Sequence, residues 1–298
     1  MSISFPTKIE SVKIAKDFDL THFGISRTIS HLGSVKTMDS NHLYWAKNIE
    51  NLEKITIGTV ICNQEIFDKV NQKNNVTYLV SKVNSRLDFC KILISHFEQD
   101  KLIDFKNTVE SHRTDPSILI GDNVFIGENV TIGSNTIIHH NVSIYSNTFI
   151  GDHCVIHSGV TLGTEGLGLE FDEELDKYIK FPQLGGVIIE DQVELGPGTT
   201  IRRAALENTI IGRGTKIGAL CNIGHNSIIG KNCIFTCNVI LGGSSRIGDK
   251  VFMGVGSIVK NGISVGDNST IGQGAVVVKN VPHSETWVGN PALKIESR

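Results

Sequence analysis

A six-residue repeat runs through most of this 298-residue chain and limits the folds that it can adopt. It occupies residues 118–165, 187–204 and 209–280, which hold 23 hexads, and the third position is apolar in every one. At 40% apolar content, independent draws would give this pattern with a probability of about 10⁻⁹. The sixth position is Asn or Gly in 16 hexads, and both residues tolerate the left-handed backbone of a sharp corner. Each hexad is therefore predicted to be a short strand and a turn, and the hexads to stack into a solenoid.

The hexads ILIGDN, VFIGEN and VTIGSN, which begin at Ile118, resemble the hexapeptide-repeat family. That resemblance implies a left-handed parallel β-helix in which three hexads cover the three sides of a prism. Residues 18 apart, with no insertion between them, then lie one above another. The predicted fold class is mainly β, a left-handed parallel β-helix preceded by a small α/β domain.

Residues 1–105 carry no hexads. Apolar runs at 56–62 and 76–80 predict strands, and the spacing of apolar residues at 85–97 predicts a helix. We interpret this region as a small α/β domain.

The other boundaries follow from the repeat. Residues 106–117 are predicted to be a linker, 118–280 the β-helix and 281–298 a C-terminal tail. The coil is interrupted at 166–186, and the acidic residues of this excursion predict a solvated surface loop.

Charge and hydropathy exclude several classes of partner. The chain has 28 basic and 31 acidic side chains, which argues against a nucleic-acid footprint or a polybasic membrane patch. No apolar stretch approaches the ~18 residues of a membrane span, so we expect a cytoplasmic protein with no membrane insertion. The six cysteines lack zinc-site spacing, and no metal is expected.

His225, in the hexad CNIGHN, is the candidate catalytic base because it lies at a corner, two residues after the inward Ile223. Gly243 follows 18 residues later without an insertion, so it should lie next to His225. A glycine there leaves its N–H approachable, as an acyl-transfer site requires for a developing oxyanion.

Three segments make the resemblance more specific. GTEGLGLEF (163–171), KFPQLGGVIIEDQVELGPGTTI (180–201) and IGHNSIIG (223–230) resemble the UDP-3-O-acylglucosamine N-acyltransferases of lipid A and lipopolysaccharide synthesis. The resemblance implies that His225 is the general base and that the Gly243 N–H polarises a thioester. It also implies a homotrimer, and an N-terminal domain that holds the nucleotide base.

Residues near this site and in the N-terminal domain are predicted to bind the acceptor. Where the family reads Asp-Arg-Gly, this chain has Arg202, Arg203 and Ala204. The predicted acceptor-binding residues are Tyr44, Trp45, Asn226, Arg202 and Arg203. Because neighbouring residues of a strand point to opposite faces, only one of the two aromatic rings can meet the ligand.

The tail suggests the acyl donor. The family's helical C-terminal extension, associated with acyl carrier protein, is not found here, and the segment from Gly289 to Ala292 is similar to the ending of acetyl-CoA-dependent sugar acetyltransferases. The column above Gly243 continues through Asn261 and Lys279, a track for pantetheine. The predicted donor-binding residues are Asn261, Lys279, Gly289, Pro291 and Lys294.

The sequence therefore predicts an N-acyltransferase that moves an acetyl or other short acyl group from CoA to the amine of a nucleotide-linked amino sugar. One alternative is a lipid A pathway enzyme that uses acyl carrier protein. Another is a noncatalytic β-helix that binds a partner. His139 and His157, 18 apart, are predicted to stack without binding a metal.

Overall fold

The computed structural model describes residues 3–35, 37–97, 106–112 and 115–295, which fall into two compact units. The first unit contains residues up to 101 together with 167–182. The second contains 102–166 and 183–298. The predicted boundary at residue 105 lies outside the described residues.

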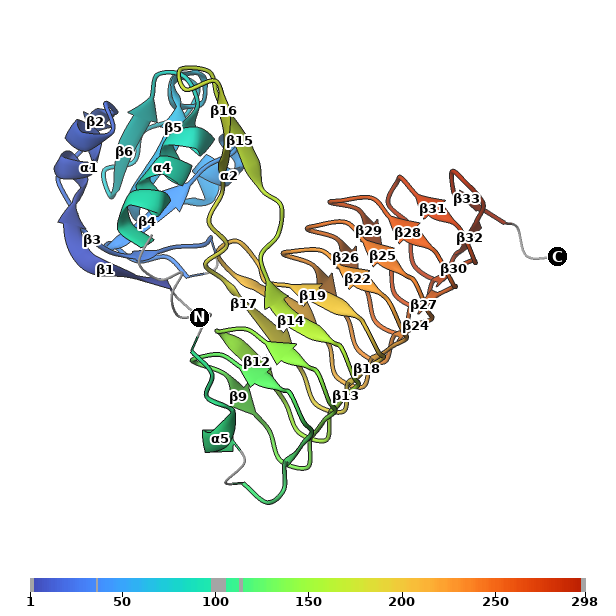
Figure 1. Cartoon of the computed structure of the whole chain (residues 1–298). Helices are drawn as coiled ribbons and strands as arrows, with labels where there is room; N and C mark the ends of the chain where they lie inside the picture. Colours follow the sequence, from blue (N-terminus) through green and yellow to red (C-terminus); the bar gives the residue numbers. More distant parts are fainter. Residues whose placement is uncertain (1–2, 36, 98–105, 113–114, 296–298) are drawn as a thin grey trace. The chain divides into compact units, whose positions relative to one another are not determined.

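The second unit is a coil with three sides, each a stack of short parallel strands (Figure 1). Side one consists of β7 (Leu119–Ile120), β10 (Ile137–Ile138), β13 (Val155–Ile156), β18 (Glu194–Leu195), β21 (Lys216–Ile217), β24 (Ile234–Phe235), β27 (Phe252–Met253), β30 (Thr270–Ile271), β32 (Thr286–Val288) and the antiparallel β33 (Leu293–Lys294). Side two consists of β8 (Phe125–Ile126), β11 (Ser143–Ile144), β14 (Thr161–Thr164), β19 (Thr200–Arg202), β22 (Asn222–Ile223), β25 (Ile240–Leu241), β28 (Ile258–Val259) and β31 (Val276–Val277). Side three consists of β9 (Thr131–Ile132), β12 (Thr148–Ile150), β17 (Gly186–Ile189), β20 (Asn208–Ile211), β23 (Ile228–Ile229), β26 (Arg246–Ile247) and β29 (Ser264–Val265). The short helix α5 (Val109–His112) precedes the first coil.

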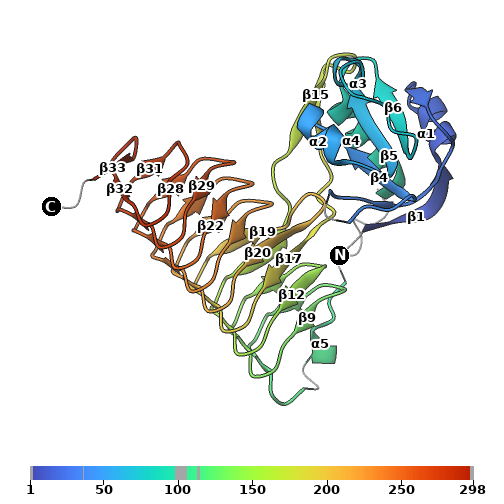
Figure 2. The same ribbon diagram turned by 180° about the vertical axis from the view of Figure 1, so that it is seen from behind.

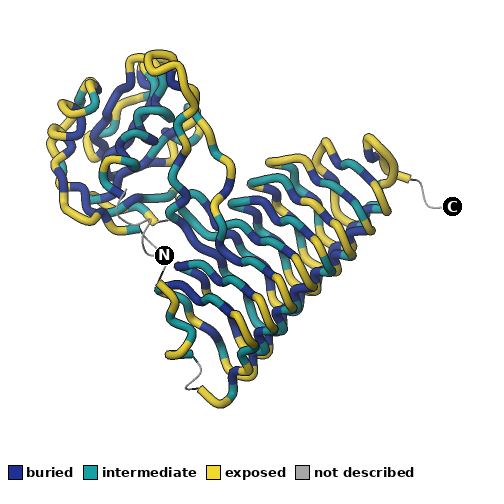
Figure 3. Tube along the Cα trace, viewed as in Figure 1, coloured by how far each residue is buried: buried dark blue, intermediate teal, exposed yellow. Residues whose placement is uncertain are grey.

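The third-position side chains form one continuous stack in the core of the coil. All of them are buried except Ile120, in the first coil, which is partly buried against the same cluster. Figure 3 shows buried, half-buried and exposed residues alternating along each coil. First-position side chains such as Val142 and Cys221 are buried in the same cluster, so the third position of the repeat predicts only part of the core.

The corners have the left-handed backbone that the sixth positions predict. A positive φ occurs at 20 of the 23 sixth positions, for example 61° at Asn226. Ile223 pairs with Leu241 across β22 and β25, so residues 18 apart lie one above another, as predicted.

The first unit has a six-stranded sheet in the order β1-β3-β4-β5-β6-β2, with β3 to β6 parallel. Its strands are β1 (Ile3–Glu10), β2 (Thr21–Phe23), β3 (Thr28–Leu32), β4 (His42–Trp45), β5 (Gly58–Asn63) and β6 (Val76–Ser81). Its helices are α1 (Ser11–Asp17), α2 (Ile49–Lys54), α3 (Gln64–Phe67) and α4 (Ser85–Phe97). Figure 2 shows β4, β5 and β6 with α4 against them. The predicted helix at 85–97 is confirmed, and so are the two predicted strands, with β5 beginning two residues later than expected.

The excursion from the coil differs from the solvated loop that was predicted. It contains an antiparallel hairpin of β15 (Leu169–Asp172) and β16 (Lys177–Lys180) that packs on α4. Glu170 pairs with Arg86, and Asp172, buried, pairs with Lys91 at 2.7 Å. The Lys91 ammonium lowers the pKa of the Asp172 carboxyl. Two of the acidic residues thus form the ion pairs that join the hairpin to α4.

Candidate active site

The corner that follows β22 carries the candidate base. Ile223 points into the core, and two residues later His225 lies half-buried at the corner. The positive φ of Asn226 then turns the chain onto side three. The hexad pattern thus places an imidazole at the edge of a rigid coil.

The side chain of Asn226 fixes the orientation of His225. Asn226 Oδ1 lies 2.8 Å from His225 Nδ1 and accepts a hydrogen bond from the Ala205 N–H at 3.1 Å. A backbone N–H can only donate, so the amide atom that it meets is the oxygen, and Nδ1 must also donate to it. His225 Nε2 therefore keeps its lone pair and can accept a proton. Asn226 thus orients the base, and its predicted contact with the acceptor stays a prediction.

Gly243 lies directly against the free nitrogen of this imidazole. A Cβ added at Gly243 would be 2.7 Å from His225 Nε2, so only glycine leaves this space open. At some other fifth positions the N–H donates to a carboxylate of the next coil, as Lys231 does to Asp249 Oδ1 at 2.7 Å. Within the described ranges, no acceptor meets the Gly243 N–H. A proton acceptor and an available N–H donor therefore lie side by side.

Gly166, which the sequence analysis did not select, also touches the imidazole. It is buried, and a Cβ there would be 2.6 Å from His225 Cδ2. The only available signal was the pair of glycines in GTEG at the point where the repeat is interrupted. The first residue of the excursion thus forms one wall of the candidate site.

The two arginines after β19 have different environments. Arg203 is buried, with Nε donating to Gly163 O and Nη2 to Ser146 Oγ at 3.4 Å. This corrects its predicted role in acceptor binding, because the guanidinium is directed into the protein. Arg202 is half-buried beside Thr164 and stays a candidate acceptor contact.

The predicted donor-binding residues fall into two groups. Asn261 and Lys279 are exposed in the column above Gly243. In the tail, Gly289 has a φ of 91° and Pro291 is exposed. Lys294 pairs with Glu285 at 2.8 Å and lowers the pKa of that carboxyl, so its charge already has a partner. Lys279 is therefore the better candidate for a phosphate contact.

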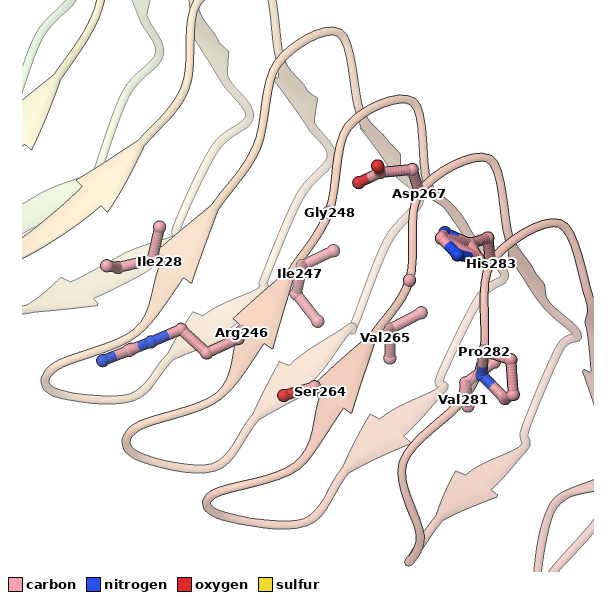
Figure 4. Close-up of a pocket in the computed structure, with 11 residues that line it drawn as sticks. Ile228, Arg246, Ile247, Gly248, Ser264, Val265, Asp267, Val281, Pro282 and His283 are labelled. Carbon is pink, nitrogen blue, oxygen red and sulfur yellow. The ribbon is translucent and has the colours of Figure 1, made fainter. Parts of the chain in front are cut away.

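A shallow groove lies on side three (Figure 4). It begins next to the column of residues that runs from His225 through Gly243 and Asn261. Arg246 and Ser264 lie on its strands, and Asp267 and His283 lie on its turns. Each lining strand directly follows a column residue in the chain, and the Arg246 guanidinium donates to the carbonyl of Asn226. The groove therefore extends from the corner that holds the candidate base.

In the first unit, the structure separates the two aromatic candidates. Tyr44 is 2% exposed, and a Cβ at Gly33 or at Gly58 would overlap its ring. Its predicted contact with a ligand is corrected, since the ring is part of the core. Trp45 is half-buried at the end of β4, where its Nε1 donates to Ser85 Oγ and the Arg86 guanidinium lies 5.9 Å from its ring centre.

His139 and His157 stack as predicted, with ring centres 4.9 Å apart and an interplanar angle of 14°. His157 Nε2 lies 3.0 Å from Glu194 Oε1. In the part of the chain that the structure describes, no three His, Cys, Asp or Glu side chains are grouped as a metal site requires. No helix among the described residues is long and apolar enough to span a membrane.

Two repeat families match the coil. Residues 129–164 match "Bacterial transferase hexapeptide (six repeats)", and residues 244–279 match "Hexapeptide repeat of succinyl-transferase".

Curated relatives match this chain over only part of their own length. A UDP-3-O-acylglucosamine N-acyltransferase of Coxiella burnetii is 51% identical over 79 residues, 26% of this chain and 23% of the relative. One of Polynucleobacter asymbioticus is 36% identical over 113 residues, 37% of this chain and 32% of the relative. The matches thus span a third or less of each relative.

Solved structures match the coil more widely. LpxA of Acinetobacter baumannii has a TM-score of 0.52 and 26% identity, covering 61% of this chain and 70% of that one. UDP-N-acetylglucosamine O-acyltransferase of Moraxella catarrhalis has a TM-score of 0.51 and 24% identity, covering 61% and 73%. With the stacked sheets described above, these similarities confirm the predicted fold class. The chain therefore contains hexapeptide-repeat segments within a three-sided parallel β-helix, and part of its sequence is similar to the UDP-3-O-acylglucosamine N-acyltransferases.

Proposed function

We propose that the protein is an N-acyltransferase that moves an acetyl or other short acyl group from CoA to the amine of a nucleotide-linked amino sugar. The observation that carries this proposal is the contact between Gly243 and the free Nε2 of His225. A base and an oxyanion donor at one corner are the two groups that amide formation from a thioester needs.

The proposed reaction uses these two groups in turn. The amine attacks the thioester carbonyl carbon, and a C–N bond forms while His225 Nε2 takes a proton from the amine. The carbonyl oxygen becomes an oxyanion that accepts a hydrogen bond from the Gly243 N–H. The C–S bond then breaks, and the imidazolium returns its proton to the leaving sulfur.

CoA is the proposed donor because the tail carries Gly289, Pro291 and Ala292 in the order found in acetyl-CoA-dependent sugar acetyltransferases. The exposed Asn261 and Lys279 support a pantetheine track along the same column. The test is to incubate the protein with a panel of nucleotide amino sugars and acyl-CoAs, and to detect the amide by mass spectrometry. Product with a CoA thioester is expected, and its absence in a His225→Ala sample is the control.

The second candidate function is the lipid A pathway reaction with an acyl carrier protein as donor. The 51% identical segment of the Coxiella burnetii relative favours it. Turnover with acyl carrier protein and with no CoA thioester would select this candidate. If a pure sample turns over neither donor, the protein is a noncatalytic β-helix that binds a partner.

A homotrimer is part of the proposal, since His225 is half-buried at a corner that a second copy could close. The measurement is light scattering of an active sample. An active species with the mass of one chain would contradict it.

Trp45 is proposed to stack on the nucleotide base of the acceptor. It lies at the carboxyl end of the parallel strand β4, the edge at which α/β sheets bind ligands. Trp45→Ala should raise the acceptor KM by ~5- to 150-fold, with less effect on the donor KM, because base stacking contributes ~1–3 kcal/mol. Tyr44→Ala is the contrasting variant and should instead destabilise the protein by ~3–5 kcal/mol. If Trp45→Ala folds and has a normal acceptor KM, the base is held elsewhere.

A further inference from the structure

Arg203 is a buried cation one coil before His225. Ile201, two residues before Arg203, pairs with Ile223 across β19 and β22. This pairing places the corner that carries Arg203 next to the corner that carries His225. Its side chain donates to Gly163 O and to Ser146 Oγ, and its backbone N–H donates to Thr164 O at 2.9 Å. Burial of a guanidinium is costly unless such bonds compensate it, so the geometry of its acceptors is tightly set.

The first connection to His225 runs through the start of the excursion. Gly163 has a φ of 83°, and the pairing of β14 with β19 shifts register between Leu162 and Thr164. The strand therefore leaves the regular ladder at the residue whose carbonyl Arg203 holds. Three residues later, Gly166 packs against His225 Cδ2.

The second connection runs through the residues that follow Arg203. The Ala204 N–H donates to Gly186 O at 3.3 Å, and the Ala205 N–H donates to Asn226 Oδ1 at 3.1 Å. That same oxygen accepts the proton on His225 Nδ1. The insertion at 205–208 breaks the hexad register here, so regular stacking does not hold this N–H in place.

We propose that Arg203 is a positioning residue for the base. Its guanidinium holds the Gly163–Gly166 segment, which contacts the His225 ring. Its backbone continues to Ala205, whose N–H fixes the Asn226 side chain that binds His225 Nδ1. Both of these contacts of the imidazole therefore depend on one buried side chain. The proposal rests on His225 being the base of the proposed function. Arg203 touches no reacting atom, and its effect is to keep Nε2 unprotonated and facing Gly243.

The test compares Arg203→Met with Arg213→Met, an exposed arginine that occupies the same hexad position as Arg203. Arg203→Met should lower kcat by ~10²-fold with KM values for both substrates near those of the wild type, because a displacement of about 1 Å has such an effect. Arg203→Lys, which can still donate to Gly163 O, should recover part of that loss. Arg213→Met should match the wild type.

A second readout does not require turnover. Histidine labelled with the heavy nitrogen isotope reports by NMR which ring nitrogen carries the proton, and the His225 signals are those missing from a His225→Ala sample. At a pH of about 8.5, where imidazole is neutral, the wild type should show a single tautomer with the proton on Nδ1. Arg203→Met should show a mixture of the two tautomers.

The outcomes separate the two proposals. If Arg203→Met keeps both the single tautomer and the kcat of Arg213→Met, Arg203 only fills space and the inference is wrong. If Arg203→Met does not fold, Arg203→Lys decides: the partial loss of kcat expected of lysine, together with a mixture of tautomers, supports the inference, and a kcat and a tautomer equal to those of the wild type overturn it. If no donor is turned over but the tautomer responds, the positioning role stands and the proposed function fails.

Discussion

Replacing His225 with alanine is expected to lower kcat by ~10²–10⁴-fold, the usual scale for loss of a general base. The imidazole is half-buried at a corner and fills no part of the core, so the melting temperature should change little. KM values should also stay near those of the wild type, because the proposed role of His225 is proton transfer rather than binding. The measurements are steady-state kinetics and a thermal melt on the same preparation.

His140→Ala is the matched control, since His140 occupies the same hexad position on side one and is exposed. Its loss should leave kcat unchanged. A His225→Ala variant with near-native turnover would remove His225 from the mechanism. A kcat loss accompanied by a large fall in melting temperature would assign the effect to the coil instead.

Regular stacking explains why the sequence predicted the centre of this site. Ile223 and Leu241 belong to one uninterrupted column, so the contact between His225 and Gly243 follows from a separation of 18 residues. The same arithmetic predicted the stacked rings of His139 and His157. Where the hexads continue without insertion, each residue's neighbours in the next coil can be read from the sequence.

The rest of the site is formed where that register breaks. Gly166 begins the excursion, and Ala205 belongs to the four-residue insertion that precedes β20, so no periodicity relates either of them to His225. Asn226 has the same residue type as many other corners, and only its contact with Ala205 shows that it orients the base. Arg203 was assigned to the acceptor because it lies where the resembling family reads Asp-Arg-Gly, yet irregular backbone there provides buried acceptors for it.

In the first unit, the sequence pattern does not predict which aromatic ring is buried. Alternation along β4 predicts that one of Tyr44 and Trp45 faces inward, but it does not say which one. Gly33 and Gly58 decide this, because their missing side chains make the space that the Tyr44 ring fills. Gly33 follows β3 and Gly58 begins β5, so the complementarity appears only after the sheet has formed.

Gly243→Ala is expected to lower kcat by ~10²–10³-fold. The added methyl would lie 2.7 Å from His225 Nε2, closer than van der Waals contact allows, so either the imidazole or the corner must move. A shift of about 1 Å in a catalytic group costs ~10²-fold, and loss of one oxyanion donor costs ~10²–10³-fold. The N–H itself is retained, so the loss would come from displacement of the base and obstruction of the carbonyl.

Gly256→Ala tests whether a methyl on a corner is harmful in itself. Gly256 has a φ of 68°, where alanine is strained by ~1 kcal/mol, and a Cβ there meets nothing within 4 Å. It should therefore lower the melting temperature more than Gly243→Ala does, while kcat stays near that of the wild type. Reduced turnover in Gly243→Ala without reduced stability is then specific to the contact with Nε2. Near-native kcat in Gly243→Ala would show that the thioester is polarised elsewhere, since a methyl group in this position cannot coexist with the proposed oxyanion.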